Sequence, residues 1–227
     1  MTARVTVEGL FVGSVEDRWP SKPPTAIGKR SLSQTVLVTE NGLDGDVQAD
    51  LTVHGGPDKA LHHYPGEHFA VWSHELARDD LIPGGFGENI STIGLTEDAV
   101  CIGDIFALGT AKVQISQGRQ PCWKLNSHTG DDRMAWRFQK TGRTGWYYRV
   151  LAPGEVGIGD ALTLIERPCP EWSVMSVTRA RLTRRISLQD ARTLATLPEL
   201  ANGWRDAFAR LAQGNRQEDT AKRLQGS

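Results

Sequence analysis

The alternation of apolar and polar positions predicts a chain built mainly of short strands. Residues 5–15 are strand-like, with Val5, Val7, Leu10 and Val12 as apolar members. Over residues 111–116, Val113 and Ile115 alternate with polar neighbours, which is the period of a half-buried strand. Further short apolar or β-branched runs predict strands at residues 35–39, 100–108, 146–151 and 161–165. Residues 19–30 contain three prolines, and because proline cannot donate to a strand ladder we expect a loop there.

Helical spacing is found in two places before residue 170. Phe69, Trp72 and Leu76 are spaced so that they share one face of a helix over residues 67–77. A shorter helix is predicted over residues 131–139, between two of the strands. The first part of the chain is therefore mainly β with some α.

The pattern changes after Pro168-Cys169-Pro170, where the strand signals stop and Ala, Leu, Arg and Gln dominate. Ser187 is placed to cap the start of one helix. Trp204, Phe208 and Leu211 share a face of another. We expect a β domain over residues 1–170 and a small C-terminal helical subdomain over residues 171–227.

Composition excludes several classes of protein. The 26 basic and 27 acidic residues nearly cancel, so no nucleic-acid-binding footprint stands out. Three cysteines leave an odd count without paired spacing, which favours a reducing compartment over a disulfide framework. No run reaches the roughly 18 apolar residues of a membrane helix, and no signal peptide is evident. We expect a cytoplasmic protein that binds neither nucleic acid nor membrane, with its oligomeric state open.

Cys122 is the strongest candidate for chemistry. It follows the strand at 111–116 on a predicted loop, after Gly118 and Pro121, with Arg119 and Lys124 on either side. Two cations beside a thiol favour the thiolate, which is the form that attacks or binds metal. Burial as filler is the alternative at this position, whereas Cys101 in an apolar run is expected to be a core residue.

Two glycine-rich stretches have both a functional and a plain interpretation. The run from His54 through Gly55 and Gly56 to Lys59 could bind an anion through its amides and Lys59, or could simply be a turn. Residues 84–89 could form a backbone cradle beside a ligand, or only a flexible loop. On these residues alone, neither stretch is decisive.

Taken in order, the motifs resemble the MOSC family (molybdenum cofactor sulfurase C-terminal domain). The resemblance covers essentially the whole chain and rests on six motifs whose order is specific although each is weak alone. They are Gly42-Leu43-Asp44-Gly45-Asp46, the run His54–Ala60, His63-Tyr64-Pro65, Phe86-Gly87-Glu88-Asn89, Gly103-Asp104 and Gln117–Cys122. Gly145-Trp146-Tyr147 and the helical tail are similar more specifically to the YiiM-like members.

The resemblance implies a β-barrel-like fold that holds a molybdenum cofactor, a pterin (molybdopterin), in a groove. Cys122 would be the thiolate ligand of molybdenum, which agrees with the interpretation of the residues themselves, because a soft thiolate suits a redox-active transition metal. The residues expected to bind the rest of the cofactor are Lys29, Gly55, Gly56, Lys59, Glu88, Asn89 and Arg119. His54 is the candidate proton donor, since an unperturbed imidazole titrates near neutral pH.

Three functions follow from the residues and the resemblance together. The first is a reductase that removes oxygen from N-hydroxylated compounds such as purines, supplied with electrons by a flavoprotein. The second is a carrier of the cofactor or of sulfur, using a Cys122 persulfide without turnover. The third is a non-catalytic domain whose helical tail docks a partner. We rank them in this order.

Overall fold

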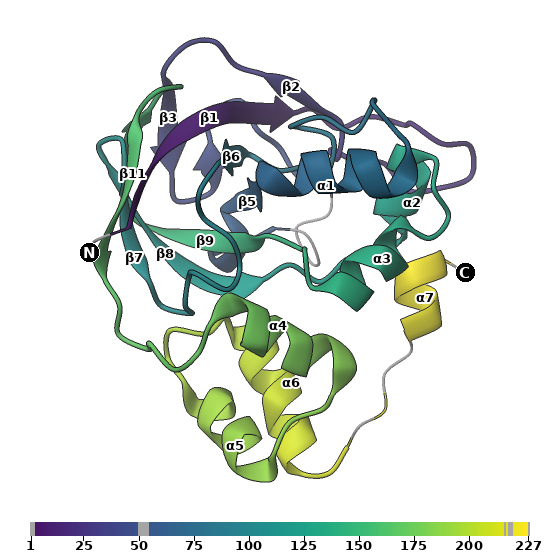
Figure 1. The fold of residues 1–227 in the computed structure, drawn as a ribbon, viewed down its shortest axis with the longest axis vertical. Helices are drawn as coiled ribbons and strands as arrows, with labels where there is room; N and C mark the ends of the chain where they lie inside the picture. The colour runs from purple at the N-terminus through teal and green to yellow at the C-terminus, as the bar shows by residue number, and fades with distance from the viewer. Residues whose placement is uncertain (1–2, 50–54, 216, 218–219, 227) are drawn as a thin grey trace.

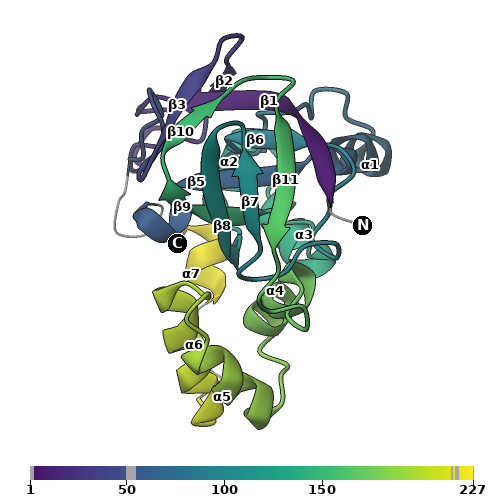
Figure 2. The same ribbon diagram turned by 90° about the vertical axis from the view of Figure 1, so that its left-hand side faces the viewer.

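Seven strands close into a barrel because the first strand of the chain pairs with the last. β1 (Arg4–Gly13) runs antiparallel to β11 (Ala161–Glu166), with Val5 opposite Leu162. Around the barrel β11 is followed by β7 (Ile105–Leu108), β8 (Ala111–Gly118), β9 (Trp146–Ala152), β5 (Leu61–Pro65) and β6 (Ile90–Thr92), which returns to β1 (Figure 2). These elements come from a computed structural model that describes residues 3–49, 55–215, 217 and 220–226.

One pair of barrel strands is parallel, and a helix makes the connection. β5 and β6 are parallel with His63 opposite Ile90, while the other barrel pairings are antiparallel. Parallel neighbours need a crossover, which α1 (Glu67–Leu76) and the loop after it provide. Shorter strands lie outside the barrel: β2 (Lys29–Ser31) on the end of β1, and a small sheet of β3 (Val36–Thr39), β4 (Gly42–Leu43) and β10 (Gly154–Val156).

The barrel interior is filled by the inward positions of its strands. In β8 the predicted alternation holds, with Val113 and Ile115 fully buried and Lys112 exposed. Leu10, Phe106 and Trp146 are fully buried in the same cluster. The barrel is therefore a packed core, and any ligand site must lie outside it.

A second, aromatic cluster lies under the helices on one side of the barrel (Figure 1). α1, α2 (Trp123–Thr129) and α3 (Met134–Thr141) all contribute to it or cover it. Phe69 and Trp72 are buried there with Leu76 beside them, which confirms the predicted helix face. Phe69 stacks on Phe86 with ring centroids 4.9 Å apart, so the 84–87 loop is fixed against the helix.

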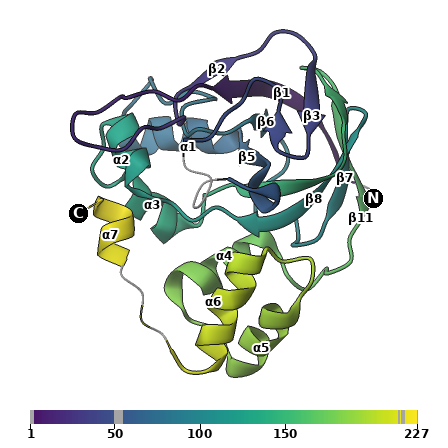
Figure 3. The ribbon, with the colours of Figure 1, turned by 180° about the vertical axis from the view of Figure 1, so that it is seen from behind.

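The C-terminal helices pack below the barrel (Figures 1 and 3). They are α4 (Val174–Thr183), α5 (Leu188–Thr196) and α6 (Asn202–Ala212), while α7 (Thr220–Gln225) lies beside α2. Ser187 caps α5 as predicted, accepting from the Asp190 amide at 3.0 Å. Trp204, Phe208 and Leu211 are buried in the same apolar cluster as the barrel.

The predicted fold class, mainly β with α and a helical C-terminal part, is confirmed, but several element boundaries are corrected. Residues 100–104 form a turn instead of a strand, because Gly103 has φ of 85° and the Asp104 carboxylate accepts from the Cys101 amide. Lys29–Ser31 is a strand that begins in the last two residues of the predicted loop, and β5, β6 and α2 were not predicted. β5 is buried at all five positions, so it lacks the alternation that reveals half-buried strands.

No helix in the described part of the chain is long and apolar enough to span a membrane.

Candidate functional site

A cavity of about 80 Å³ lies beside the barrel, between the loop at residues 25–29, the segment at 46–49 and the segment that follows β8. This volume is below the range of about 300–1,000 Å³ of small-molecule sites, so the cavity alone holds only part of such a ligand. An open groove of about 930 Å³ adjoins the cavity. Ala49, Lys59, Cys122, Lys124 and Tyr147 line both, so the cavity and the groove meet at these residues.

Cys122 lies at this meeting point. β8 ends at Gly118, and the chain then runs through Pro121 to Cys122, which is the N-cap residue of α2 with φ of −136° and ψ of 169°. The cysteine is half-buried, in contrast to the buried Cys101 and Cys169. The loop predicted up to Cys122 is present, and a helix starts directly after it.

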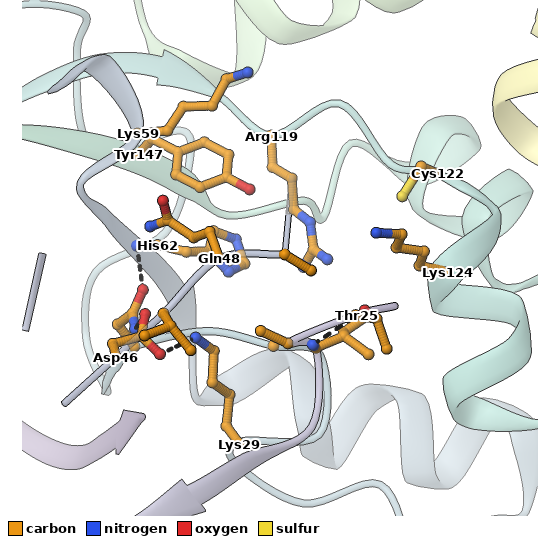
Figure 4. A pocket seen from close by; sticks show the side chains of 16 residues that line it. Thr25, Lys29, Asp46, Gln48, Lys59, His62, Arg119, Cys122, Lys124 and Tyr147 are labelled. Carbon is orange, nitrogen blue, oxygen red and sulfur yellow. Dashed lines mark hydrogen bonds and ion pairs between the residues drawn. The ribbon is translucent and has the colours of Figure 1, made fainter. Parts of the chain in front are cut away.

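Two nearly buried cations point into the same space as the thiol. Arg119 and Lys124 are 7% and 8% exposed. Arg119 Nη1 donates to the Phe86 carbonyl at 2.7 Å, and Lys124 Nζ donates to the Pro24 carbonyl at 3.4 Å. Figure 4 shows the Cys122 sulfur, the Lys124 ammonium and the Arg119 guanidinium directed toward one volume. The site therefore combines a soft donor atom with positive charge.

Lys29 lies on the opposite wall and its charge is compensated. Its ammonium pairs with Asp46 at 2.5 Å, and the two side chains are 6% and 2% exposed. Asn89 is fixed to the same carboxylate, since Nδ2 donates to Asp46 at 2.8 Å and to the Phe11 carbonyl at 3.1 Å. Its Oδ1 accepts from the His62 amide at 3.0 Å. Both amide N–H donors of Asn89 are thus used within the protein, and the residue shapes the wall.

Glu88 is not among the cavity-lining residues, contrary to the expectation that it contacts the cofactor. It is fully buried, and its carboxylate accepts from the backbone amides of Gly84 and Phe86. Burial raises the pKa of this carboxyl, and these hydrogen bonds oppose the shift. Glu88 therefore holds the 84–87 loop, and this loop supplies the Phe86 carbonyl that fixes Arg119.

The glycine-rich run lies along the groove. Pro57–Lys59 forms a single 3₁₀ turn, η1, in which the Lys59 amide donates to the Gly56 carbonyl at 2.9 Å. Gly56 has φ of 91°, a left-handed conformation that favours glycine. Gly55, Gly56 and Lys59 all line the groove, so the segment is both a turn and part of the site. His54, the predicted proton donor, lies outside the described residues.

Sequence reasoning missed several cavity residues, and two of them, His62 and Tyr147, carry titratable side chains. His62 is buried in β5, with Nε2 3.4 Å from the Thr144 carbonyl, and burial followed by the charge of Arg119 lowers its pKa well below the usual range. Tyr147 of β9 presents its ring to the cavity, and burial raises the pKa of its hydroxyl. At neutral pH the cavity therefore holds a neutral imidazole and a protonated phenol.

The fold and site define a closed β-barrel with a thiol and nearly buried cations beside an outer cavity. Comparison with known proteins identifies the family. The family model described as "MOSC domain" matches residues 50–163. The chain belongs to the MOSC domain family.

The relatives agree with this assignment. The protein YiiM of Escherichia coli (strain K12) is 38% identical over 219 residues, covering 96% of this chain and 97% of YiiM. The crystal structure of YiiM from Escherichia coli superimposes with a TM-score of 0.79 over 98% of both chains. A protein named "Reductase" from Gibberella moniliformis is 38% identical over 177 residues. The matched residues are 77% of this chain and 31% of that longer protein.

Proposed function

We propose that the protein is a molybdenum-cofactor-dependent reductase of N-hydroxylated compounds such as N-hydroxylated purines. The observation that carries the proposal is the half-buried Cys122 thiol facing the same cavity as the nearly buried Arg119 and Lys124. Membership of the MOSC family and the relative named "Reductase" support the oxidoreductase class.

The residues of the cavity fit such a cofactor. A cysteine thiolate is a soft ligand that suits a redox-active transition metal. The phosphate of the pterin needs cations, and Arg119, Lys124 and Lys59 line the cavity. Lys29 contributes less than the sequence suggests, since Asp46 already compensates its charge. When bound, the cofactor would supply two-electron removal of oxygen from an N–OH group.

The overall reaction takes an N–OH group, two electrons and two protons to an N–H group and water. A flavoprotein is the class of partner that would supply the electrons. Tyr147 keeps its proton, because burial raises its pKa, and can donate a hydrogen bond to an oxygen atom of the substrate. Arg119 and Lys124, both nearly buried, would balance the negative charge of the cofactor.

Proton delivery is assigned to His54, as the sequence predicts. His62 is a weaker candidate, because burial and Arg119 hold its pKa so low that it is neutral at working pH. A neutral His62 could orient a ligand by hydrogen bonding but has no extra proton to give.

The test compares the wild-type protein with Cys122→Ser, both expressed in a host that makes the molybdenum cofactor. Metal and pterin analysis should find near-stoichiometric molybdenum in the wild type and loss of it in the variant. Reduction of 6-N-hydroxylaminopurine should follow the metal content. Thermal melting should change little, because Cys122 is half-buried at a helix end and outside both apolar clusters.

Other outcomes would change the assignment. Cofactor without reduction would favour a carrier of cofactor or sulfur. Full activity of Cys122→Ser would remove the thiolate from the mechanism.

A further inference from the structure

His62 carries an unpaired ring nitrogen at the wall of the cavity. The residue is 3% exposed and lines the cavity, and its Nδ1 has no hydrogen-bond partner in the described part of the chain. Its Nε2 lies 3.4 Å from the Thr144 carbonyl, and because a carbonyl only accepts, the ring proton is on Nε2. Nδ1 is therefore an acceptor. Burial, together with the charge of Arg119, lowers the pKa of the imidazole and keeps it neutral.

The neighbouring histidine shows that the fold does not have to leave such a nitrogen unpaired. His63, one residue further along β5, has each ring nitrogen 3.0 Å from a hydroxyl oxygen, of Tyr148 and of Thr92. Buried polar atoms are paired in the great majority of cases, and an exception calls for an explanation. A ligand that supplies the missing hydrogen is the explanation that the cavity offers, since His62 lines it.

The backbone beside the His62 ring fixes its orientation. Besides the Thr144 carbonyl, Gly145 packs so closely that a Cβ atom there would lie 3.0 Å from His62 Nε2. Gly145 is itself held, because its amide donates to the buried Glu97 carboxylate at 2.7 Å. Figure 4 shows the His62 ring directed toward the Arg119 guanidinium. A ring that is already oriented loses little freedom on binding, which favours its use as a ligand contact.

Hydrogen-bond donors lie beside this acceptor. Tyr147 is opposite His62 in the pairing of β5 with β9, and the two ring centroids are 5.0 Å apart. Burial raises the pKa of the Tyr147 hydroxyl, so it stays protonated, and Figure 4 shows it directed into the cavity. Arg119 donates to the Phe86 carbonyl through Nη1, which uses one of the five N–H groups of a guanidinium. The cavity wall therefore presents one acceptor beside several donors.

This pattern disfavours a bare oxyanion and selects a group that both donates and accepts. An unprotonated phosphate or carboxylate would bind Arg119 and Tyr147 but would turn oxygen lone pairs toward His62 Nδ1. A ring N–H next to a carbonyl, as in a cyclic amide, satisfies both kinds of partner. The cavity of about 80 Å³ has the volume of about two to three water molecules, at about 30 Å³ each. It can take one edge of a ring, and the rest of the ligand lies in the groove.

We propose that the cavity binds the cyclic amide edge of a nitrogen heterocycle, with the ring N–H donating to His62 Nδ1 and the carbonyl accepting from Tyr147 and Arg119. A pterin carries this edge, and 6-N-hydroxylaminopurine presents the same pattern in its N-hydroxyimino form. The edge therefore belongs to the cofactor or to the substrate of the proposed reductase. The inference rests on the proposed function only for these two sources, and binding is measured without turnover.

The binding test titrates cofactor-free, full-length protein with hypoxanthine and with purine in a calorimeter. Purine has the same two rings but lacks both the amide N–H and the carbonyl. Hypoxanthine should bind at least about tenfold more tightly, because purine leaves the buried acceptor unpaired. His62→Phe should lose most of this preference, whereas His62→Gln keeps a side-chain acceptor and should retain part of it.

A second variant removes a donor and leaves His62 in place. Tyr147→Phe deletes one hydroxyl and should weaken hypoxanthine binding about threefold to tenfold, with purine binding unchanged. Tyr148→Phe is the matched control, because that hydroxyl contacts His63 and Tyr148 does not line the cavity. Thermal melting separates a binding role from a structural one. His62→Phe should lower Tm less than His63→Phe, since both ring nitrogens of His63 are paired.

Two results would overturn the proposal. The first is equal binding of hypoxanthine and purine, or binding of neither, by the folded wild type, even with reductase activity intact. The second is an unchanged preference in both His62→Phe and Tyr147→Phe.

Titration of cofactor-loaded protein distinguishes the two sources of the edge. Loss of hypoxanthine binding on loading, with reduced pterin content in His62→Phe, would assign the edge to the pterin. Retained binding with the same preference would assign it to the substrate. Absence of any reductase activity would refute the proposed function, whereas a preference lost in His62→Phe would still support the amide-binding site.

Discussion

At the scale of single residues, Asp46 connects three segments around the cavity. Its carboxylate accepts from the Gly13 amide at 2.7 Å, pairs with Lys29 and accepts from Asn89. These partners come from β1, β2 and the residue before β6. The residue therefore contributes to the shape of the site although it adds no net charge to it.

Asp46→Asn should destabilise the protein strongly. The substitution leaves the Lys29 ammonium buried without a counter-charge, and breaking a buried pair costs about 3–5 kcal/mol of the free energy of unfolding. Urea unfolding measures this directly. Asp44→Asn removes the same charge at an exposed position two residues away and should stay within about 0.5 kcal/mol of the wild type. Similar values for the two variants would mean that the pair is not effectively buried.

His63 is a second residue whose substitution should change the stability of the protein measurably. It is fully buried between the Tyr148 hydroxyl and Thr92 Oγ1, each 3.0 Å from a ring nitrogen. Burial lowers its pKa to about 3. The native state therefore keeps this imidazole neutral at pH values where the unfolded chain, with a histidine pKa of about 6.5, binds a proton.

This predicts that stability falls as pH decreases below about 6.5. In that window the unfolded state binds one more proton at His63 than the native state, so the free energy of unfolding falls by up to about 1.4 kcal/mol per pH unit. Urea unfolding between pH 6.5 and 5 should show a shallower slope for His63→Asn than for the wild type by about this amount. Parallel slopes would show that His63 is protonated in the native state.

At the scale of elements, helix ends and loops place the functional groups. Cys122 is the N-cap residue of α2, so the thiol is held at a fixed end of a helix instead of in a flexible loop. The side-chain Nδ2 of Asn126 donates to the Leu224 carbonyl at 2.9 Å, which ties α7 to this helix. The position of Cys122 therefore depends on packing by a segment about 100 residues later in the chain.

The cap of α5 gives a prediction of defined size. Ser187→Ala removes the side-chain acceptor of the Asp190 amide and should cost about 1 kcal/mol, while Ser187→Gly should cost only a few tenths. Urea midpoints of the two variants and the wild type measure the difference. No loss in Ser187→Ala would mean that water or another group replaces the cap.

At the scale of the whole molecule, the barrel and the C-terminal helices share one apolar cluster. Val174 and Val177 of α4 and Trp204 of α6 are buried in the same cluster as Val113 and Trp146 of the barrel. The Ala201 amide also donates to the Ser116 carbonyl at 2.9 Å. The sequence boundary near Glu171 thus separates strands from helices, while packing continues across it.

Truncation after Glu171 should therefore destabilise the barrel. Several buried side chains would be lost, each worth about 1.5–3 kcal/mol, and 1 kcal/mol corresponds to about 2–4 °C in Tm for a chain of this size. We expect Tm to fall by more than about 10 °C in a circular dichroism melt. Truncation after Gly214 keeps α4–α6 and should have a much smaller effect. An unchanged Tm after the first truncation would establish two independent domains.

The sequence by itself determined the elements whose signals are local. Alternation in β8 and helical spacing at Phe69 and Trp72 report which side of each element is buried, because these periods follow from backbone geometry alone. Ser187 as a cap, the order of the family motifs and the flanking of Cys122 by Arg119 and Lys124 were also readable from neighbouring residues.

Only the tertiary structure decided which distant residues form the site. β5 and β6 were not predicted, because fully buried strands show no alternation. His62 lies on β5 and was therefore not recognised as a site residue. Lys29 pairs with Asp46, Asn89 donates to Asp46 and to the Phe11 carbonyl, and the Glu88 carboxylate accepts from two backbone amides. No spacing in the sequence could reveal these contacts. His62 and Tyr147 line one cavity because β5 and β9 pair in the closed barrel. Charge compensation and burial depend on contacts between segments far apart in the chain, and these exist only once the barrel closes.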